Sequence, residues 1–317
     1  MEKISDIKTL TEEELKNWLK EVGEKPFRAD QIRNRLFCGQ VKSFNEMETI
    51  PAALREKLSA NFRITSLEEA KRLISVDGTV KWLYQTHDGH HIETVLIPTN
   101  DRFSVCVSTQ IGCAQNCAFC RTAKMGFIRN LEAGEILEEI IRVNWYLEET
   151  GTKHSDGSLA KVTNIIFMGM GEPLNNLEQV HRVCCTLHHQ KLFNLGRKRM
   201  TISTSGVVPK IKELVDRNTP CCLAVSLNST NDERRSAVMP VNKVWNIAKL
   251  LEATDEYTKR TGNYVTFEFV LMKGITCSEE AARELIRICA PRRCKVNAIV
   301  LNDGDDPTLE APSLEEI

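Results

Sequence analysis

The sequence predicts an α/β protein, with a core of alternating strands and helices that forms a partial (βα)6 TIM-type barrel or an open sheet. Three observations support this class. Strand-like and helical segments alternate from Phe103 onward, an order typical of parallel βαβ units. Helical periodicity dominates residues 1–65, and turn dipeptides divide residues 66–100. We therefore expect a helical accessory domain over 1–65, a β-meander extension over 66–100 and the core over 101–317.

The first 65 residues show three short amphipathic helices. Thr11 followed by Glu14 is a capping box, and apolar residues follow it at helical spacing. A second helix is expected over 29–37. A third is expected to begin at Pro51, because proline is favoured in the first turn of a helix.

The next segment predicts antiparallel strands. Residues 71–76, 79–86 and 91–98 are rich in strand-forming side chains and are separated by Asp77-Gly78 and Asp88-Gly89, dipeptides typical of hairpin turns. Glu93 lies in the third run. Taken alone, it reads as a solvent-facing strand residue.

Residues from Phe103 onward predict the core. The expected strands are 103–108, 162–168, 199–203, 221–226, 265–271 and 295–301, and the expected helices are 131–147, 177–189, 207–216, 244–259 and 278–289. In parallel α/β folds the reactive groups gather at the carboxyl ends of the strands. Loops that follow these strands are therefore the places to search for a site.

Composition restricts the function classes. With 42 basic and 43 acidic residues, the net charge is -1, so no global field attracts nucleic acid. Neither a signal-peptide core nor a membrane-spanning apolar run is present, and we expect a cytoplasmic protein. There thiols stay reduced, so the 12 cysteines favour metal or redox roles over disulfides. Several cysteines are expected to be small core side chains: Cys184, Cys185, Cys221, Cys222 and Cys289.

Three cysteines stand in a loop after the first core strand. Cys113, Cys117 and Cys120 are spaced C-x3-C-x2-C, which suits a [4Fe-4S] cluster held at three irons. The fourth iron would then be open to a small molecule. A closed zinc site is the alternative, with Cys106 as fourth ligand, but zinc spacing usually comes as two pairs, and Cys106 lies back inside the strand.

Polar or glycine residues also end the other core strands. Gly171 and Glu172 follow the second strand, where glycines allow close approach of a ligand; an ordinary strand-to-helix turn is the alternative. Ser203 ends the third strand, where it could equally belong to a helix N-cap. The fourth strand ends at Ser226, Leu227 and Asn228, and the sixth at Asn302.

These motifs resemble those of a known family. The C-x3-C-x2-C loop resembles that of the radical S-adenosylmethionine (SAM) superfamily, and GMGEP resembles its Gly-Gly-Glu motif. More narrowly, the chain resembles the RlmN/Cfr family of RNA adenine methyltransferases, and follows RlmN more closely. The stretches that carry the resemblance, in order, are CVSTQIGCAQNCAFCRTAKMGFIRNL, MGMGEPLNN, TISTSGVVPKI, LAVSLNS, MPVNK and CKVNAI.

The resemblance implies a role for each position. Cys113, Cys117 and Cys120 would hold the [4Fe-4S] cluster. S-adenosyl-L-methionine would contact Gly171, Glu172, Ser203, Ser226, Leu227, Asn228 and Asn302, although many relatives have His where Asn228 stands. Glu93 matches the proposed proton acceptor, and Cys106 matches the cysteine that forms a transient disulfide. The implied enzyme methylates C2 of an adenosine in 23S rRNA, in the peptidyl-transferase region, and of the anticodon-adjacent adenosine in certain tRNAs.

The resemblance also implies that the helical domain over 1–65 binds RNA, and it implies partners. These are the rRNA and tRNA substrates and an electron donor such as flavodoxin or ferredoxin, with the protein a monomer. Basic side chains that could contact phosphates are Arg121, Lys124, Arg129, Lys191, Arg197, Lys198 and Arg199.

One departure concerns the C-terminus. The family's methyl-carrying cysteine belongs to a C-terminal segment, whereas the last cysteine here is Cys294 and Ser313 with Glu316 reads as the start of a helix. We therefore expect a truncated chain that leaves RNA unmethylated. The alternatives are another radical SAM enzyme, such as a glycyl-radical activase, and a non-catalytic RNA-binding remnant.

Overall fold

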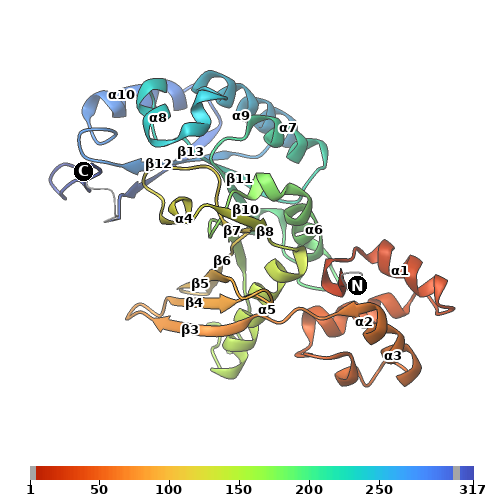
Figure 1. Cartoon of the computed structure of the whole chain (residues 1–317). Helices are drawn as coiled ribbons and strands as arrows, with labels where there is room; N and C mark the ends of the chain where they lie inside the picture. Colours follow the sequence, from red (N-terminus) through yellow and green to blue (C-terminus); the bar gives the residue numbers. More distant parts are fainter. Residues whose placement is uncertain (1–4, 303–307) are drawn as a thin grey trace. The chain divides into compact units, whose positions relative to one another are not determined.

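The computed structural model describes residues 5–302 and 308–317 (Figure 1). Contacts divide the chain into two compact units. The first unit comprises Met1–Ser108, Leu131–Gly169 and Glu178–Met200, and the second comprises Thr109–Asn130, Met170–Leu177 and Thr201–Ile317. Each unit is described by itself.

The first unit begins with the three predicted helices, α1 (Glu12–Glu21), α2 (Arg28–Cys38) and α3 (Ala52–Asn61). The capping box is confirmed, because Thr11 Oγ1 accepts from Glu14 N at 3.2 Å and Glu14 Oε2 accepts from Thr11 N at 2.7 Å. The inward faces carry buried leucines and isoleucine: Leu15, Leu19, Ile32, Leu36, Leu54 and Leu58. Pro51 is the residue before α3 rather than its first residue.

The meander is also confirmed. Strands β3 (Glu68–Ile74), β4 (Val80–Gln85), β5 (His91–Thr99) and β6 (Arg102–Cys106) pair antiparallel in sequence order, and β9 (Asn164–Phe167) pairs parallel with β6. Gly78 and Gly89 adopt φ values of 82° and 83° at the two predicted turns, a conformation that glycine adopts without steric cost.

Helix α5 (Ala133–Glu149) packs on one face of this sheet. Alternation along β4 and β5 places Trp82 and Thr94 on that face. Trp82 packs edge to face against Tyr146, with 5.2 Å between the ring centroids. Thr94 Oγ1 donates to Glu139 Oε2 at 2.5 Å. The opposite face of the sheet therefore carries Lys81, Glu93, Val95 and Cys106.

The second unit contains four parallel strands in the order β13-β12-β11-β10. They are β10 (Met200–Thr204), β11 (Cys222–Ser226), β12 (Val265–Leu271) and β13 (Cys294–Val300). Between them run α7 (Val208–Asp216), α8 (Asp232–Val238), α9 (Ile247–Thr261) and α10 (Glu279–Cys289), grouped beside the strands in Figure 1. The predicted α/β class is thus confirmed, while closure into a partial barrel stays a prediction.

Several local features differ from the expectation. The cysteine loop is framed by a short hairpin, β7 (Gln110–Gly112) with β8 (Phe127–Asn130), and contains α4 (Arg121–Lys124). The Ser313 segment forms a turn rather than a helix, although Ser313 N donates to Glu316 Oε2 at 2.8 Å. Of the expected core cysteines, Cys184 and Cys221 are buried and Cys222 and Cys289 are partly buried. Cys185 is exposed, because it stands on the outer side of α6 (Leu177–His188).

No helix among the described residues is both long and apolar enough to cross a membrane.

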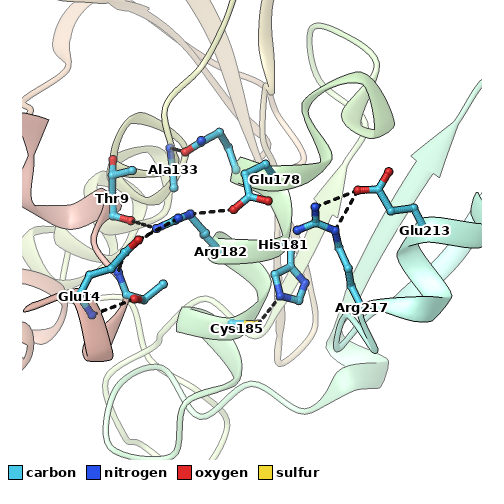
Figure 2. Close-up of polar contacts among 11 residues, drawn as sticks. Thr9, Glu14, Ala133, Glu178, His181, Arg182, Cys185, Glu213 and Arg217 are labelled. Carbon is cyan, nitrogen blue, oxygen red and sulfur yellow. Dashed lines mark hydrogen bonds and ion pairs between the residues drawn. The ribbon is translucent and has the colours of Figure 1, made fainter. Parts of the chain in front are cut away.

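Two polar contacts join the N-terminal helices to later parts of the first unit. Arg182 of α6 donates to Glu14 Oε2 at 2.6 Å and to Thr9 O at 3.2 Å, and Figure 2 shows it between Glu14 and Glu178. Hydrogen bonding from Arg182 lowers the pKa of the Glu14 carboxyl to about 2. This contact is half-exposed, so its contribution to stability is small.

The second contact is buried. Lys8 Nζ donates to Glu138 Oε2 of α5 at 2.5 Å and to Thr65 O at 2.6 Å, and the Lys8 and Glu138 side chains are 1% and 4% exposed. Arg142 Nε also reaches Glu138, at 3.0 Å. Removing one partner of a buried pair leaves a charge without compensation.

We predict that Lys8→Met lowers the free energy of unfolding by about 3 kcal/mol, because Glu138 stays buried with only Arg142 as partner. Lys16→Met is the matched control, since Lys16 pairs with Glu12 on the surface of α1 and should change stability by less than about 0.5 kcal/mol. Urea unfolding followed by tryptophan fluorescence measures both. Equal effects of the two substitutions would contradict the prediction.

Candidate functional site

The cysteine loop begins at a position that requires glycine. Gly112 has a φ of 73°, and a Cβ there would lie 1.7 Å from Gly126 O. This close approach lets Cys113 N donate to Gly126 O at 2.9 Å. Cys120 N donates to Cys117 O at 3.1 Å. The hairpin β7–β8 thus fixes both ends of a short loop that carries all three cysteines.

The three thiols affect one another. Burial raises the pKa of Cys113 to about 11 and that of Cys117 to about 12, and the neighbouring Cys120 acts in the same direction on both. Metal binding requires thiolates. A cation bound here would offset the burial and the mutual repulsion that together keep the Cys113 and Cys117 thiols protonated.

The donor set fits an iron–sulfur cluster. Among the described residues, no three His, Cys, Asp or Glu side chains lie close enough to hold one metal ion. A cluster spreads its protein thiolates over different irons, so its ligands stand farther apart than those of a single zinc. The spacing of Cys113, Cys117 and Cys120 is compatible with that arrangement.

Gly171 and Glu172 form a tight turn against β7. Gly171 has a φ of 101°, and a Cβ there would lie 2.5 Å from Gln110 Cβ. Glu172 N donates to Gln110 Oε1 at 2.8 Å, and Gln110 Nε2 donates to Asn130 Oδ1 at 2.7 Å. Gln110, which was not among the predicted site residues, therefore connects the Glu172 turn to the hairpin of the cysteine loop.

The Glu172 carboxylate is bound within the protein. Its Oε2 accepts from Ser205 N and Ser205 Oγ, both at 2.7 Å, and its Oε1 accepts from Leu174 N at 3.0 Å. Burial raises the pKa of Glu172, while the bonds from Ser205 oppose that shift. Glu172 thus holds the backbone just beyond β10. Ser205 lies in the stretch TISTSGVVPKI but was not among the predicted site residues.

The remaining predicted positions lie beside the carboxyl ends of strands in the second unit. Ser203 is partly buried near the end of β10, Ser226 ends β11, and Asn302 is exposed after β13. Leu227 N donates to Glu268 O at 3.0 Å. The buried Asn228 amide accepts from Val270 N at 3.0 Å and donates to Met239 Sδ at 3.4 Å. The Asn228 side chain therefore already bonds to β12.

Arg235 of α8 is a third residue that the sequence motifs did not indicate. Its guanidinium is fully buried and donates to Ser205 O at 2.7 Å, Leu227 O at 2.8 Å and Ser226 O at 2.9 Å. The sequence signal was weak, because an arginine in the run Asp232-Glu233-Arg234-Arg235 reads as a solvated helix surface.

Glu93 and Cys106 belong to the first unit, where they share one face of its sheet. Val95 is the cross-strand partner of both Lys81 and Cys106, so these three side chains point the same way. Glu93 lies two residues from Val95 and pairs with Lys81, with 2.8 Å between Nζ and Oε1. The structure thus places Glu93 and Cys106 on neighbouring strands of a face that α5 does not cover.

Cys106 is surrounded by protein atoms while keeping some surface exposure. Burial raises the pKa of its thiol to about 12, and the carboxylates of Glu139 and Glu93 act in the same direction, whereas Lys81 opposes them. Cys106 is therefore a protonated thiol at neutral pH.

The candidate RNA-contacting cations are partly engaged. Lys191 pairs with Asp30 at 2.6 Å, and Arg199 donates to Asn164 Oδ1 at 3.2 Å. Arg121 and Lys124 are exposed on α4. Contact of these side chains with RNA stays a prediction.

Two known protein families match successive parts of this chain. The family model of the ribosomal RNA large subunit methyltransferase N-terminal domain matches residues 5–64, and that of the radical SAM superfamily matches residues 107–286. A probable dual-specificity RNA methyltransferase RlmN of Bacillus licheniformis is 42% identical over 92% of this chain and 78% of its own. The dual-specificity RNA methyltransferase RlmN of Anaeromyxobacter dehalogenans is 41% identical over 97% of this chain and 82% of its own.

A solved structure agrees with these relatives. The crystal structure of a radical SAM methyltransferase from Sphaerobacter thermophilus matches with a TM-score of 0.91 at 38% identity, covering 98% of this chain and 89% of the other. The resemblance inferred from the motifs is thereby confirmed, and with it the [4Fe-4S] cluster and S-adenosylmethionine as the cofactors of the family. The chain belongs to the RlmN family of radical SAM RNA methyltransferases.

Proposed function

We propose that the residues of this chain serve the methylation of C2 of an adenosine in the peptidyl-transferase region of 23S rRNA and of the anticodon-adjacent adenosine in certain tRNAs. The name of its relatives, dual-specificity RNA methyltransferase, supports two kinds of RNA substrate. The observation that carries the proposal is the placement of Glu93 and Cys106 on one face of adjacent strands. A carboxylate and a thiol are the two groups needed to remove a proton from C2 and to release the product.

In this proposal Cys113, Cys117 and Cys120 hold the [4Fe-4S] cluster. S-adenosylmethionine is contacted by residues at the strand ends of the second unit, namely Gly171, Glu172, Ser203, Ser226, Leu227, Asn228 and Asn302. When bound, the cluster and S-adenosylmethionine supply the one-electron chemistry that activates a methyl group toward an electrophilic carbon. The polar turn made by Gly171 and Glu172 supports this assignment, because its buried bonds hold a backbone that a ligand can approach closely.

Glu93 serves as the proton acceptor. Once the new carbon–carbon bond forms at C2 of adenine, the proton on that carbon must leave, and a carboxylate can accept it. The ion pair with Lys81 restricts the position of the carboxylate on the sheet face.

Cys106 serves in release. The product leaves when the Cys106 sulfur bonds to the sulfur of the methyl-carrying cysteine. The carbon–sulfur link to the nucleotide then breaks, its electron pair goes to the methylene carbon, and that carbon takes up a proton to become the new methyl group. Because burial keeps Cys106 protonated, this thiol loses its proton as the disulfide forms. Its raised pKa also protects it from oxidation before that step.

The proposal includes the cellular setting. RNA substrates and reduced thiols suit the cytoplasm. A low-potential electron donor such as flavodoxin or ferredoxin supplies the electron, and the protein acts as a monomer.

We predict that Cys117→Ala abolishes the cluster. After anaerobic reconstitution with iron and sulfide, the unaltered chain should be brown and should form 5′-deoxyadenosine from S-adenosylmethionine under dithionite, because three thiolates hold the cluster. The variant should show neither property. Cys185→Ala is the matched control, since Cys185 is exposed on α6 and its loss should leave iron content unchanged. A full iron and sulfide content in the Cys117 variant would overturn the ligand assignment.

We predict that Glu93→Gln lowers 2-methyladenosine formation by about a hundredfold or more, because the amide cannot accept the C2 proton. The assay is run on the 317-residue chain and on the chain extended by the C-terminal segment of a relative, which carries the cysteine that the resemblance implies. Mass spectrometry of digested rRNA and tRNA measures the product.

Glu69→Gln provides the control for this experiment. Glu69 pairs with Arg72 on β3 of the same sheet, so its substitution removes a carboxylate without touching the proposed base. Cleavage of S-adenosylmethionine should persist in both variants. If the Glu93 variant methylates RNA at the rate of the control, then Glu93 is not the proton acceptor.

A further inference from the structure

Arg235 has an environment that is unusual for an arginine. It lies on α8, whose first turn is capped by Asn231, with Asn231 Oδ1 accepting from Glu233 N at 2.9 Å and from Arg234 N at 3.2 Å. Arg234 is partly exposed on the surface, whereas Arg235 is fully buried. Two adjacent arginines on one short helix thus occupy opposite environments.

The hydrogen bonds of Arg235 all go to uncharged acceptors. Three are the backbone carbonyls of Ser205, Ser226 and Leu227, and the fourth is Asn242 Oδ1 at 2.9 Å. Asp232 reaches the guanidinium only through Asn242, whose Nδ2 donates to Asp232 Oδ1 at 2.9 Å. Within the described residues, this buried cation therefore has no carboxylate in direct contact.

The side chains that contact Arg235 therefore supply no opposite charge. Burial lowers the pKa of the Arg235 guanidinium to about 10. A buried charge requires compensation, and the negative charge of a thiolate-bound cluster would provide it here.

The cysteine loop is also attached to α8. Ala118 N donates to Val238 O, at the end of α8, at 2.9 Å. Cys117, Ala118 and Phe119 pack against an apolar cluster that includes Val238, Met239 and Val241. The distance between Arg235 and the loop is therefore fixed by backbone bonding and by packing.

We propose that Arg235 is a positioning and electrostatic residue that raises the reduction potential of the cluster held by Cys113, Cys117 and Cys120. This inference rests on the proposed function, which assigns Cys117 as a cluster ligand. The cluster accepts one electron from a low-potential donor, and this adds negative charge to a buried site. A fixed positive charge nearby stabilises the reduced form more than the oxidised form.

The test compares cluster potentials in reconstituted variants. Arg235→Gln removes the charge while keeping an amide that can donate to the carbonyls, and Arg235→Lys keeps the charge with fewer hydrogen bonds. Mediated redox titration, followed by electron paramagnetic resonance of the reduced cluster, gives the potential without any turnover. We expect Arg235→Gln to reduce the equilibrium constant for reduction about tenfold, equivalent to about 59 mV more negative for a one-electron couple. Arg235→Lys should stay near the unaltered potential.

Arg234→Gln is the matched control. It removes the same charge from the adjacent position of α8, where Arg234 faces Glu280 at the surface and solvent screens it. Its potential should not change. The proposal would be overturned if the Gln and Lys variants of Arg235 had the same potential as the control. It would also be overturned if both variants shifted equally, because the effect would then come from geometry rather than from charge.

A second variant tests the proposal if the Arg235→Gln protein does not bind a cluster. Asn242→Asp places a carboxylate beside the intact guanidinium, so it should shift the potential in the same negative direction. An unchanged potential in that variant would also contradict the proposal. Loss of the proposed function is distinguished by the Cys117 variant, because a cluster retained without Cys117 refutes the ligand assignment whatever the potentials are.

Discussion

Ser205 is bonded from two sides, and the proposed cofactor site depends on those bonds. Its N–H and Oγ donate to the buried carboxylate of Glu172, while its carbonyl accepts from the buried guanidinium of Arg235. Buried charges are stable only when hydrogen-bonded. The Glu172 carboxylate therefore fixes the turn after the second core strand. The Arg235 guanidinium fixes the ends of β10 and β11, and both groups bond to Ser205. A cofactor held there meets a backbone that is already organised.

The first unit follows a different principle. Alternation along β4, β5 and β6 divides its side chains between two faces. One face packs on α5 and includes the buried bond between Thr94 and Glu139. The other carries Glu93 and Cys106, whose proposed roles require access to a nucleotide. Stability and chemistry are thus separated on opposite sides of one sheet.

The relatives identify the family, and the geometry bears on the roles of single residues. Relatives of about 41–42% identity over most of the chain establish the family, whereas roles of single residues rest on position. Glu172, for example, matches a motif that receives a cofactor amino group, yet its carboxylate is already bonded to Ser205 and Leu174. Its contribution is then as much to the shape of the turn as to direct contact.

The sequence by itself determined the α/β class, the positions of nearly all helices and core strands, and the cysteine loop, because periodicity, capping and motif spacing are local properties. It did not indicate the hairpin around that loop, helix α8, Ser205, Gln110 or Arg235. These depend on contacts between residues far apart in the chain. Arg235 shows the reason: the sequence presents a run of charged residues, and only folding decides which of two adjacent arginines faces solvent and which is buried against backbone carbonyls.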